Sequence, residues 1–180
     1  MTVQPRADVA LMDGYHSPQV DVDVRLNTNE APDAPPAAWV DAVAAAAATI
    51  DWNRYPDRDA LELREAIGRL HGVGPEQIFP ANGSNEVLQS LLLAYGGPGR
   101  EAAVWEPTYA LHSHIAKVVG TTVVVGERDD AFEITDAEID RIFDRHRPSV
   151  AFLCSPNNPT GVVEPESVVR RVLELASARD

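Results

Sequence analysis

The sequence predicts an α/β fold, a three-layer sandwich in which helices cover both faces of a mostly parallel sheet. From residue 77 onward, segments with strand character alternate with segments of helical periodicity, an order typical of parallel sheets. The run Val150–Cys154 is apolar throughout, as expected for a strand that is buried on both faces. The chain has 180 residues, of which 44% are hydrophobic, enough for one ordinary domain with a core.

The first 76 residues lack this alternation. Residues 1–24 show little periodicity, so we expect an extended arm there. A first helix is expected over 36–49, because proline is tolerated in the first turn of a helix. Residues 51–57 are expected to form a loop. A second helix is expected over 58–71, where apolar residues recur at helical spacing before Gly72 and Gly74 end it.

The alternating region contains four expected strands and four expected helices. The strands are 77–80, 102–105, the β-branched segment 121–125 and 150–154. The helices are 84–95, 109–119, 136–145 and 164–178. In open α/β sheets ligands bind at the carboxyl ends of strands. The segments that follow the strands are therefore the candidate functional segments.

Composition and charge exclude several classes of protein. The formal net charge of −13, with a pI near 4.7, argues against a nucleic-acid partner. The single cysteine, Cys154, excludes an internal disulfide and fits a reducing cytoplasm. The longest apolar stretch, 42–50, is too short to span a membrane, and residues 1–13 lack the pattern of a secretory signal. His112 and His114 lie two positions apart on one expected helix and point in different directions, which does not favour a metal site.

Two of the candidate segments each allow two interpretations. In Asn82–Glu86, Ser84 or Asn85 can cap the following helix, and the free N–H groups of its first turn can bind an anion. The alternative is an ordinary capped helix start that binds no ligand. In Glu106–Tyr109, Tyr109 can stack on a flat heterocycle or be a half-buried core residue.

The third candidate segment, Ser155–Gly161, is the most specific. Its two prolines and its glycine favour a stiff turn that can direct an asparagine amide at a ligand. A proline-stabilised loop without a ligand is the alternative. A buried amide needs hydrogen-bond partners, and a phenolic oxygen is a suitable one.

Together these segments resemble the fold-type-I aminotransferases of class I and II, which use pyridoxal 5'-phosphate (PLP). The resemblance rests on Asn-Gly-Ser-Asn-Glu at 82–86, Pro-Thr-Tyr at 107–109 and Ser-Pro-Asn-Asn-Pro-Thr-Gly at 155–161. Two upstream segments, 26–32 and Arg-Tyr-Pro-Asp at 54–57, are similar to those of histidinol-phosphate aminotransferases. On this resemblance, residues 1–50 form an N-terminal arm with the first helix, and residues 51–180 form the first part of the cofactor-binding large domain.

The resemblance also implies roles for individual residues. Backbone N–H groups of Ser84 and Asn85 would bind the cofactor phosphate, and Tyr109 would stack on the pyridine ring. Asn158 would donate a hydrogen bond to the phenolic oxygen of that ring. Tyr55 would reach the phosphate in the neighbouring subunit, which implies a homodimer. The implied reaction converts histidinol phosphate and 2-oxoglutarate to imidazole-acetol phosphate and glutamate, in the cytoplasm, with small-molecule substrates and no nucleic-acid or membrane partner.

One requirement of this chemistry is not met by the sequence. PLP enzymes need a lysine that forms the Schiff base, and the family's lysine follows the Asn-Pro-Thr-Gly run. The one lysine here is Lys117, which precedes that run and is expected to be a solvated surface residue. We therefore expect no catalytic residue in this chain and a truncated form that is inactive alone. The alternatives are an aromatic-amino-acid aminotransferase, a phosphothreonine decarboxylase relative, or a non-catalytic half-domain.

Overall fold

The computed structural model describes residues 3–14 and 18–178. Contacts divide the chain into two compact units, Met1–Asp13 with Ala81–Asp180, and Gly14–Pro80. The predicted boundary at residue 50 refers to the arm and the large domain of the family and stays a prediction.

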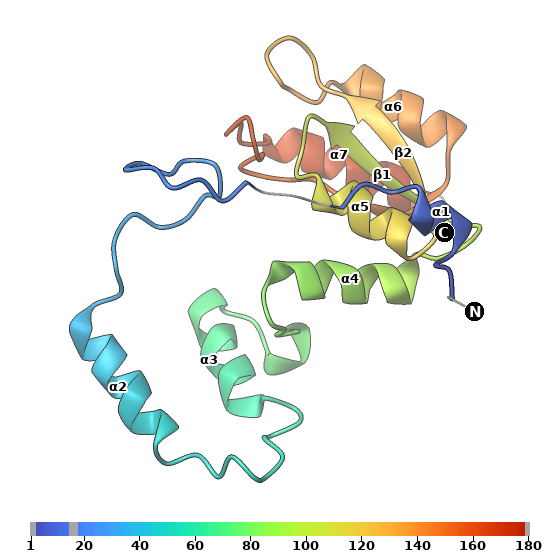
Figure 1. The fold of residues 1–180 in the computed structure, drawn as a ribbon. Helices are drawn as coiled ribbons and strands as arrows, with labels where there is room; N and C mark the ends of the chain where they lie inside the picture. Colours follow the sequence, from blue (N-terminus) through green and yellow to red (C-terminus); the bar gives the residue numbers. More distant parts are fainter. Residues whose placement is uncertain (1–2, 15–17, 179–180) are drawn as a thin grey trace. The chain divides into compact units, whose positions relative to one another are not determined.

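A parallel sheet lies at the centre of the larger unit (Figure 1). Within the described residues it has three strands in the order β2-β1-β3, with β1 at Glu101–Glu106, β2 at Thr122–Glu127 and β3 at Pro148–Ala151. Both neighbours pair parallel to β1. The predicted parallel sheet is therefore confirmed.

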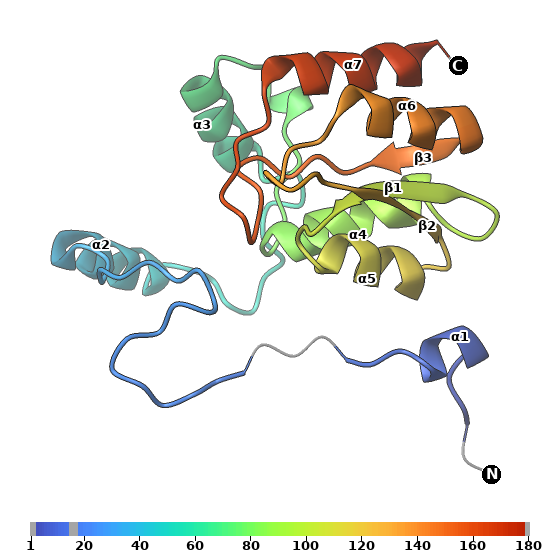
Figure 2. The same ribbon diagram turned by 90° about the horizontal axis from the view of Figure 1, so that it is seen from above.

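Helices cover both faces of this sheet (Figure 2). Helices α4 (Ser84–Tyr95) and α5 (Leu111–Val118) pack on one face, and α6 (Asp136–Arg145) and α7 (Glu166–Ser177) lie on the other. The bounds predicted for α4 and α6 match those observed. The α5 helix begins two residues later than predicted, because Tyr109 lies in the turn after β1.

Each face of the sheet has its own apolar core, because successive strand residues point to opposite sides. Ala103 and Trp105 of β1 pack with residues of α6 and α7, including Ile139 and Val172. Ala102 packs on the other side in a cluster with residues of α4 and α5, Leu92 and Ala116. The three-layer arrangement thus follows from the apolar residues on both faces of β1.

The prediction for residues 150–154 is wrong in two respects. The strand β3 ends at Ala151, and Ser149 and Ala151 are exposed while Val150 is half-buried. The reason is the position of β3 at one edge of the described sheet, beside β1 alone. An apolar run in a sequence does not reveal how many neighbours a strand has.

The predicted strand at 77–80 is also wrong. Residues Pro75–Gln77 form the 3₁₀ helix η1, with proline in its first turn. The Gly74 N–H donates a hydrogen bond to Gln77 Oε1 at 3.1 Å, which closes this turn. The segment therefore folds locally and does not join the sheet.

The N-terminal arm includes a short helix that was not predicted, α1 (Ala7–Ala10). Arg6, which precedes it, donates through Nη2 to the carbonyl of Val118 at the end of α5, at 2.7 Å. This bond attaches residues near the N-terminus to the larger unit.

The unit Gly14–Pro80 contains α2 (Ala37–Ala47), α3 (Leu61–His71) and η1. Helix α3 begins three residues later than predicted, because Asp57 accepts hydrogen bonds from the N–H groups of Asp59 and Leu61 at 3.0 and 2.8 Å. These bonds lower the pKa of the Asp57 carboxyl, with the Leu61 N–H as the larger cause. In the described segments 3–14 and 18–178, no helix is long and apolar enough to cross a bilayer.

Candidate functional site

Two loops leave the carboxyl end of the parallel sheet, one after β1 and one after β3. The first carries Thr108 and Tyr109, and the second carries Ser155–Gly161. Carboxyl ends of parallel strands meet at one edge of a sheet, so the two loops are neighbours in space although about fifty residues separate them. The sequence predicted this shared edge, and the hydrogen bonds described next confirm it.

Asn157 joins the two loops. Its side chain is 2% exposed, and its Oδ1 accepts a hydrogen bond from Thr108 Oγ1 at 2.9 Å. Its Nδ2 donates to the carbonyl of Pro107 at 3.0 Å and to Thr160 Oγ1 at 2.8 Å. The buried amide of Ser155–Gly161 is therefore that of Asn157. The family resemblance assigns the cofactor contact to the next residue, Asn158.

Tyr109 is half-buried and contacts the first turn of α4. Its hydroxyl donates to Asn85 Oδ1 at 3.1 Å. Its ring forms a T-shaped pair with the ring of His112, with centroids 5.5 Å apart and planes at 85°. His112 in turn stacks on Phe152, with centroids 4.6 Å apart. Burial lowers the pKa of His112, which favours the neutral imidazole beside Tyr109.

The start of α4 differs from the prediction in one respect. Its N-cap residue is Gly83, with φ of +83°, so the expectation that a side chain of Ser84 or Asn85 caps this helix is wrong. The side chain of Asn85 instead contacts Tyr109, and Glu86 accepts a hydrogen bond from the Asn82 N–H at 2.7 Å. Ser84 and Asn85 are exposed, and the N–H groups of a first turn have no acceptor within the helix. This turn can bind an anion.

Asn158 is exposed, directly after the buried Asn157. The structure thus brings the first turn of α4, the ring of Tyr109 and the loop of Asn158 to one edge of the sheet. These groups suit PLP, because N–H groups complement a phosphate, an aromatic ring complements a pyridine and an amide complements a phenolic oxygen. The roles of Ser84, Asn85, Tyr109 and Asn158 toward a cofactor stay predictions.

A buried ion pair that no sequence motif predicts holds the segment after the second loop. Arg128 and Glu164 form a salt bridge with side chains 1% and 0% exposed. Arg128 also donates through Nε to the carbonyl of Trp105 at 3.2 Å, while the Glu164 N–H donates to Ser155 Oγ at 3.0 Å. The pair therefore links the end of β1 to the loop that carries Asn158.

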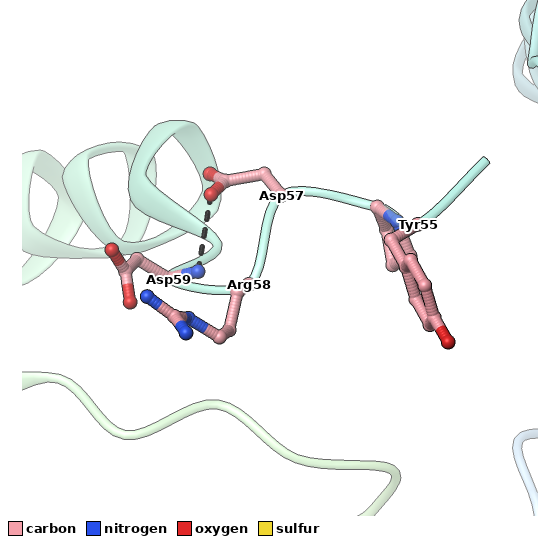
Figure 3. Close-up of a pocket in the computed structure, with 5 residues that line it drawn as sticks. Tyr55, Asp57, Arg58 and Asp59 are labelled. Atoms are coloured by element: carbon pink, nitrogen blue, oxygen red, sulfur yellow. Dashed lines mark hydrogen bonds between the residues drawn. The ribbon is translucent and has the colours of Figure 1, made fainter.

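Tyr55 belongs to the other unit, and its side chain is fully exposed. It lines a pocket formed by Tyr55–Asp59, in which its ring extends away from the start of α3 (Figure 3). The other predicted site residues belong to the larger unit. Its role in a neighbouring subunit stays a prediction.

The parallel sheet, its helical layers and the loops at one sheet edge define an α/β protein of the fold-type-I aminotransferase class. The chain belongs to the family of class I and II aminotransferases, whose family model matches residues 21–180. A histidinol-phosphate aminotransferase of Frankia casuarinae is 48% identical over 172 residues, covering 91% of this chain and 43% of the relative. The chain thus spans less than half the length of this curated relative.

Solved structures support the fold assignment. A Thermus thermophilus aspartate aminotransferase double mutant superposes with a TM-score of 0.74 and 27% identity, covering 85% of this chain and 42% of that one. The histidinol-phosphate aminotransferase of Sinorhizobium meliloti in complex with pyridoxal-5'-phosphate gives a TM-score of 0.73 at 20% identity, covering 82% of this chain and 40% of that one.

Proposed function

We propose that this chain forms part of the active site of a PLP-dependent aminotransferase that acts on histidinol phosphate and 2-oxoglutarate. The observation that carries the cofactor proposal is the contact of Tyr109 with Asn85, which joins the aromatic ring to the anion-binding turn of α4. The substrate proposal rests on the 48% identity to the Frankia casuarinae histidinol-phosphate aminotransferase. The products would be imidazole-acetol phosphate and glutamate.

In this proposal each predicted site residue binds one part of the cofactor. The N–H groups of Ser84 and Asn85 bind the phosphate, the Tyr109 ring packs on the pyridine, and Asn158 donates to the phenolic oxygen. Tyr55, fully exposed in this chain, contacts the phosphate bound by a second copy, which makes the protein a homodimer. When bound, PLP supplies the electron sink that eases loss of a proton from the carbon that bears the amino group of the donor. We also propose a cytoplasmic location, in keeping with the single cysteine.

A titration of the purified chain with pyridoxamine 5'-phosphate tests the cofactor proposal. This ligand lacks the aldehyde, so it cannot react with Lys117. We expect saturable binding that weakens at least tenfold in Tyr109→Ala and in Asn158→Ala. Gln89→Ala removes an exposed amide beyond the first turn of α4 and serves as the matched control. Binding that is unaffected by Tyr109→Ala and Asn158→Ala would contradict the proposal.

Turnover is expected to require a lysine that this chain does not contain. Lys117 is exposed on α5 and lies before the Asn-Pro-Thr-Gly run, unlike the reactive lysine of the family. The 180-residue chain should therefore show no transamination after incubation with PLP. Borohydride reduction and peptide mapping should find no stoichiometric adduct; full labelling of Lys117 together with turnover would overturn this expectation.

A chimera tests the substrate. Residues 1–180 replace the matching part of the Frankia casuarinae relative, and the product is assayed with 2-oxoglutarate and either histidinol phosphate or phenylalanine. We expect transamination of histidinol phosphate to dominate. A folded chimera that binds PLP and prefers phenylalanine would favour the aromatic aminotransferase alternative.

A further inference from the structure

We propose that Asn157 is a positioning residue, which fixes the loops of Tyr109 and Asn158 at the separation that cofactor binding requires. This inference rests on the proposed function. Asn157 itself is 2% exposed and is not assigned a contact with the cofactor. Its role would be exerted through its neighbours in the two loops.

The side-chain amide of Asn157 is committed to protein partners. The Oδ1 atom accepts from Thr108 Oγ1, and the Nδ2 atom uses both of its protons, toward Pro107 O and Thr160 Oγ1. Two of these three bonds cross from one loop to the other. A buried amide that loses such partners pays its full desolvation cost, so this geometry holds the loops in one arrangement.

The backbone of Asn157 is fixed as well. Its N–H donates to the carbonyl of Val162 at 2.7 Å, and its carbonyl accepts from the Gly161 N–H at 2.6 Å. The loop is thereby closed on itself at the residue that also bridges to Thr108. Consecutive Cα atoms are about 3.8 Å apart, so a residue that is held by both its backbone and its side chain also restricts the position of the next residue.

The two residues proposed to contact the cofactor each lie one position from this bridge. Tyr109 follows Thr108, and Asn158 follows Asn157. The adjacent asparagines therefore have separate tasks: the buried amide holds the loops together, and the exposed amide is left for the ligand. The two tasks predict different effects for substitutions at 157 and 158.

The test combines amide hydrogen exchange with a pyridoxamine 5'-phosphate titration on the full 180-residue chain. Asn157→Asp keeps the side-chain shape but replaces the Nδ2 donor with an acceptor. Thr108→Val removes the hydroxyl that donates to Asn157 and is the milder variant. Loss of one neutral hydrogen bond corresponds to roughly a three- to tenfold effect. Thr108→Val should raise exchange at the hydrogen-bonded amides of Asn157 and Gly161 and weaken ligand binding by that factor. Asn157→Asp loses both Nδ2 hydrogen bonds and should have an effect at least as large.

Asn158→Ala is the matched control at the adjacent position. It should weaken pyridoxamine 5'-phosphate binding and leave exchange at the amides of Asn157 and Gly161 at the wild-type rate. Asn157→Asp loses the bond from Nδ2 to the Pro107 carbonyl, and Thr108→Val loses the bond to Oδ1. Their effects should be non-additive, because these two bonds join the same pair of loops. Additive effects on affinity would overturn the inference.

Two further results would overturn it. One is wild-type exchange and affinity in both Asn157→Asp and Thr108→Val. The other is an equal rise of exchange at β1 and α6, which would make Asn157 a general stabiliser of the unit. If wild-type chain fails to bind the ligand while exchange rises only in the two loops, the proposed function fails and the bridging by Asn157 is supported.

Discussion

The buried salt bridge between Arg128 and Glu164 gives the sharpest stability prediction. Both side chains are removed from water, at 1% and 0% exposure, and Glu164 Oε2 has no hydrogen-bond partner among the described residues. The guanidinium charge therefore compensates most of the cost of burying this carboxylate. In Glu164→Gln the shape is kept, but Arg128 loses its counter-charge.

The expected cost follows from the burial. Breaking a buried pair by removing one partner destabilises a protein by about 3–5 kcal/mol. Arg128 keeps its hydrogen bonds to the carbonyls of Trp105 and Phe132, so we expect the lower end, about 3 kcal/mol. The pair Arg171–Asp140 offers a matched comparison, because its side chains are 38% and 41% exposed. Asp140→Asn should cost about 1 kcal/mol or less.

The assay is urea unfolding at pH 7, followed by circular dichroism for wild type, Glu164→Gln and Asp140→Asn. We expect the free energy of unfolding to fall about 2 kcal/mol further in Glu164→Gln than in Asp140→Asn. Added salt should reduce the effect of Asp140→Asn more than that of Glu164→Gln, because exposed pairs are screened. Equal destabilisation by the two variants would refute the reasoning from burial.

Two other predictions concern Gly126 and His112. A Cβ at Gly126 would lie 2.4 Å from Cδ1 of the buried Trp105, so Gly126→Ala should destabilise the chain by about 1–3 kcal/mol in thermal unfolding; an unchanged melting temperature would contradict this packing. Burial lowers the pKa of His112 below its ordinary 6.5, so the unfolded chain binds a proton first as the pH falls. Stability from this group is complete above pH 6.5 and is lost below it. In His112→Gln the free energy of unfolding should fall less between pH 7 and pH 5 than in wild type. Parallel pH profiles for the two proteins would contradict this prediction.

The sequence predicts those elements of the larger unit whose bounds depend on neighbouring residues alone. The bounds of α4 and α6 follow from the sequence, because glycine or threonine precedes each helix and the helical periodicity is strong. The edge position of β3 could not be predicted, because an apolar run has the same pattern in a central strand and in an edge strand. The segment 77–80 has the pattern of a strand but forms none, because the turn at Pro75 depends on a hydrogen bond that Gln77 Oε1 accepts from the Gly74 N–H.

The candidate site was predicted in its segments but not in its internal bonds. The loops of Tyr109 and Asn158 were identified from strand ends and from a specific motif. Their connection through Asn157 joins residues about fifty positions apart, and two adjacent asparagines carry no local signal that tells which is buried. The same holds for Arg128 and Glu164, whose pairing depends on the tertiary fold alone.

A crystal structure of this chain with pyridoxamine 5'-phosphate tests the central claim most directly. Tyr109 and Asn158 should contact the same bound ligand, with its phosphate at the first turn of α4 and its phenolic oxygen at the Asn158 amide. Ligand bound elsewhere, with neither Tyr109 nor Asn158 in contact with it, would contradict the account.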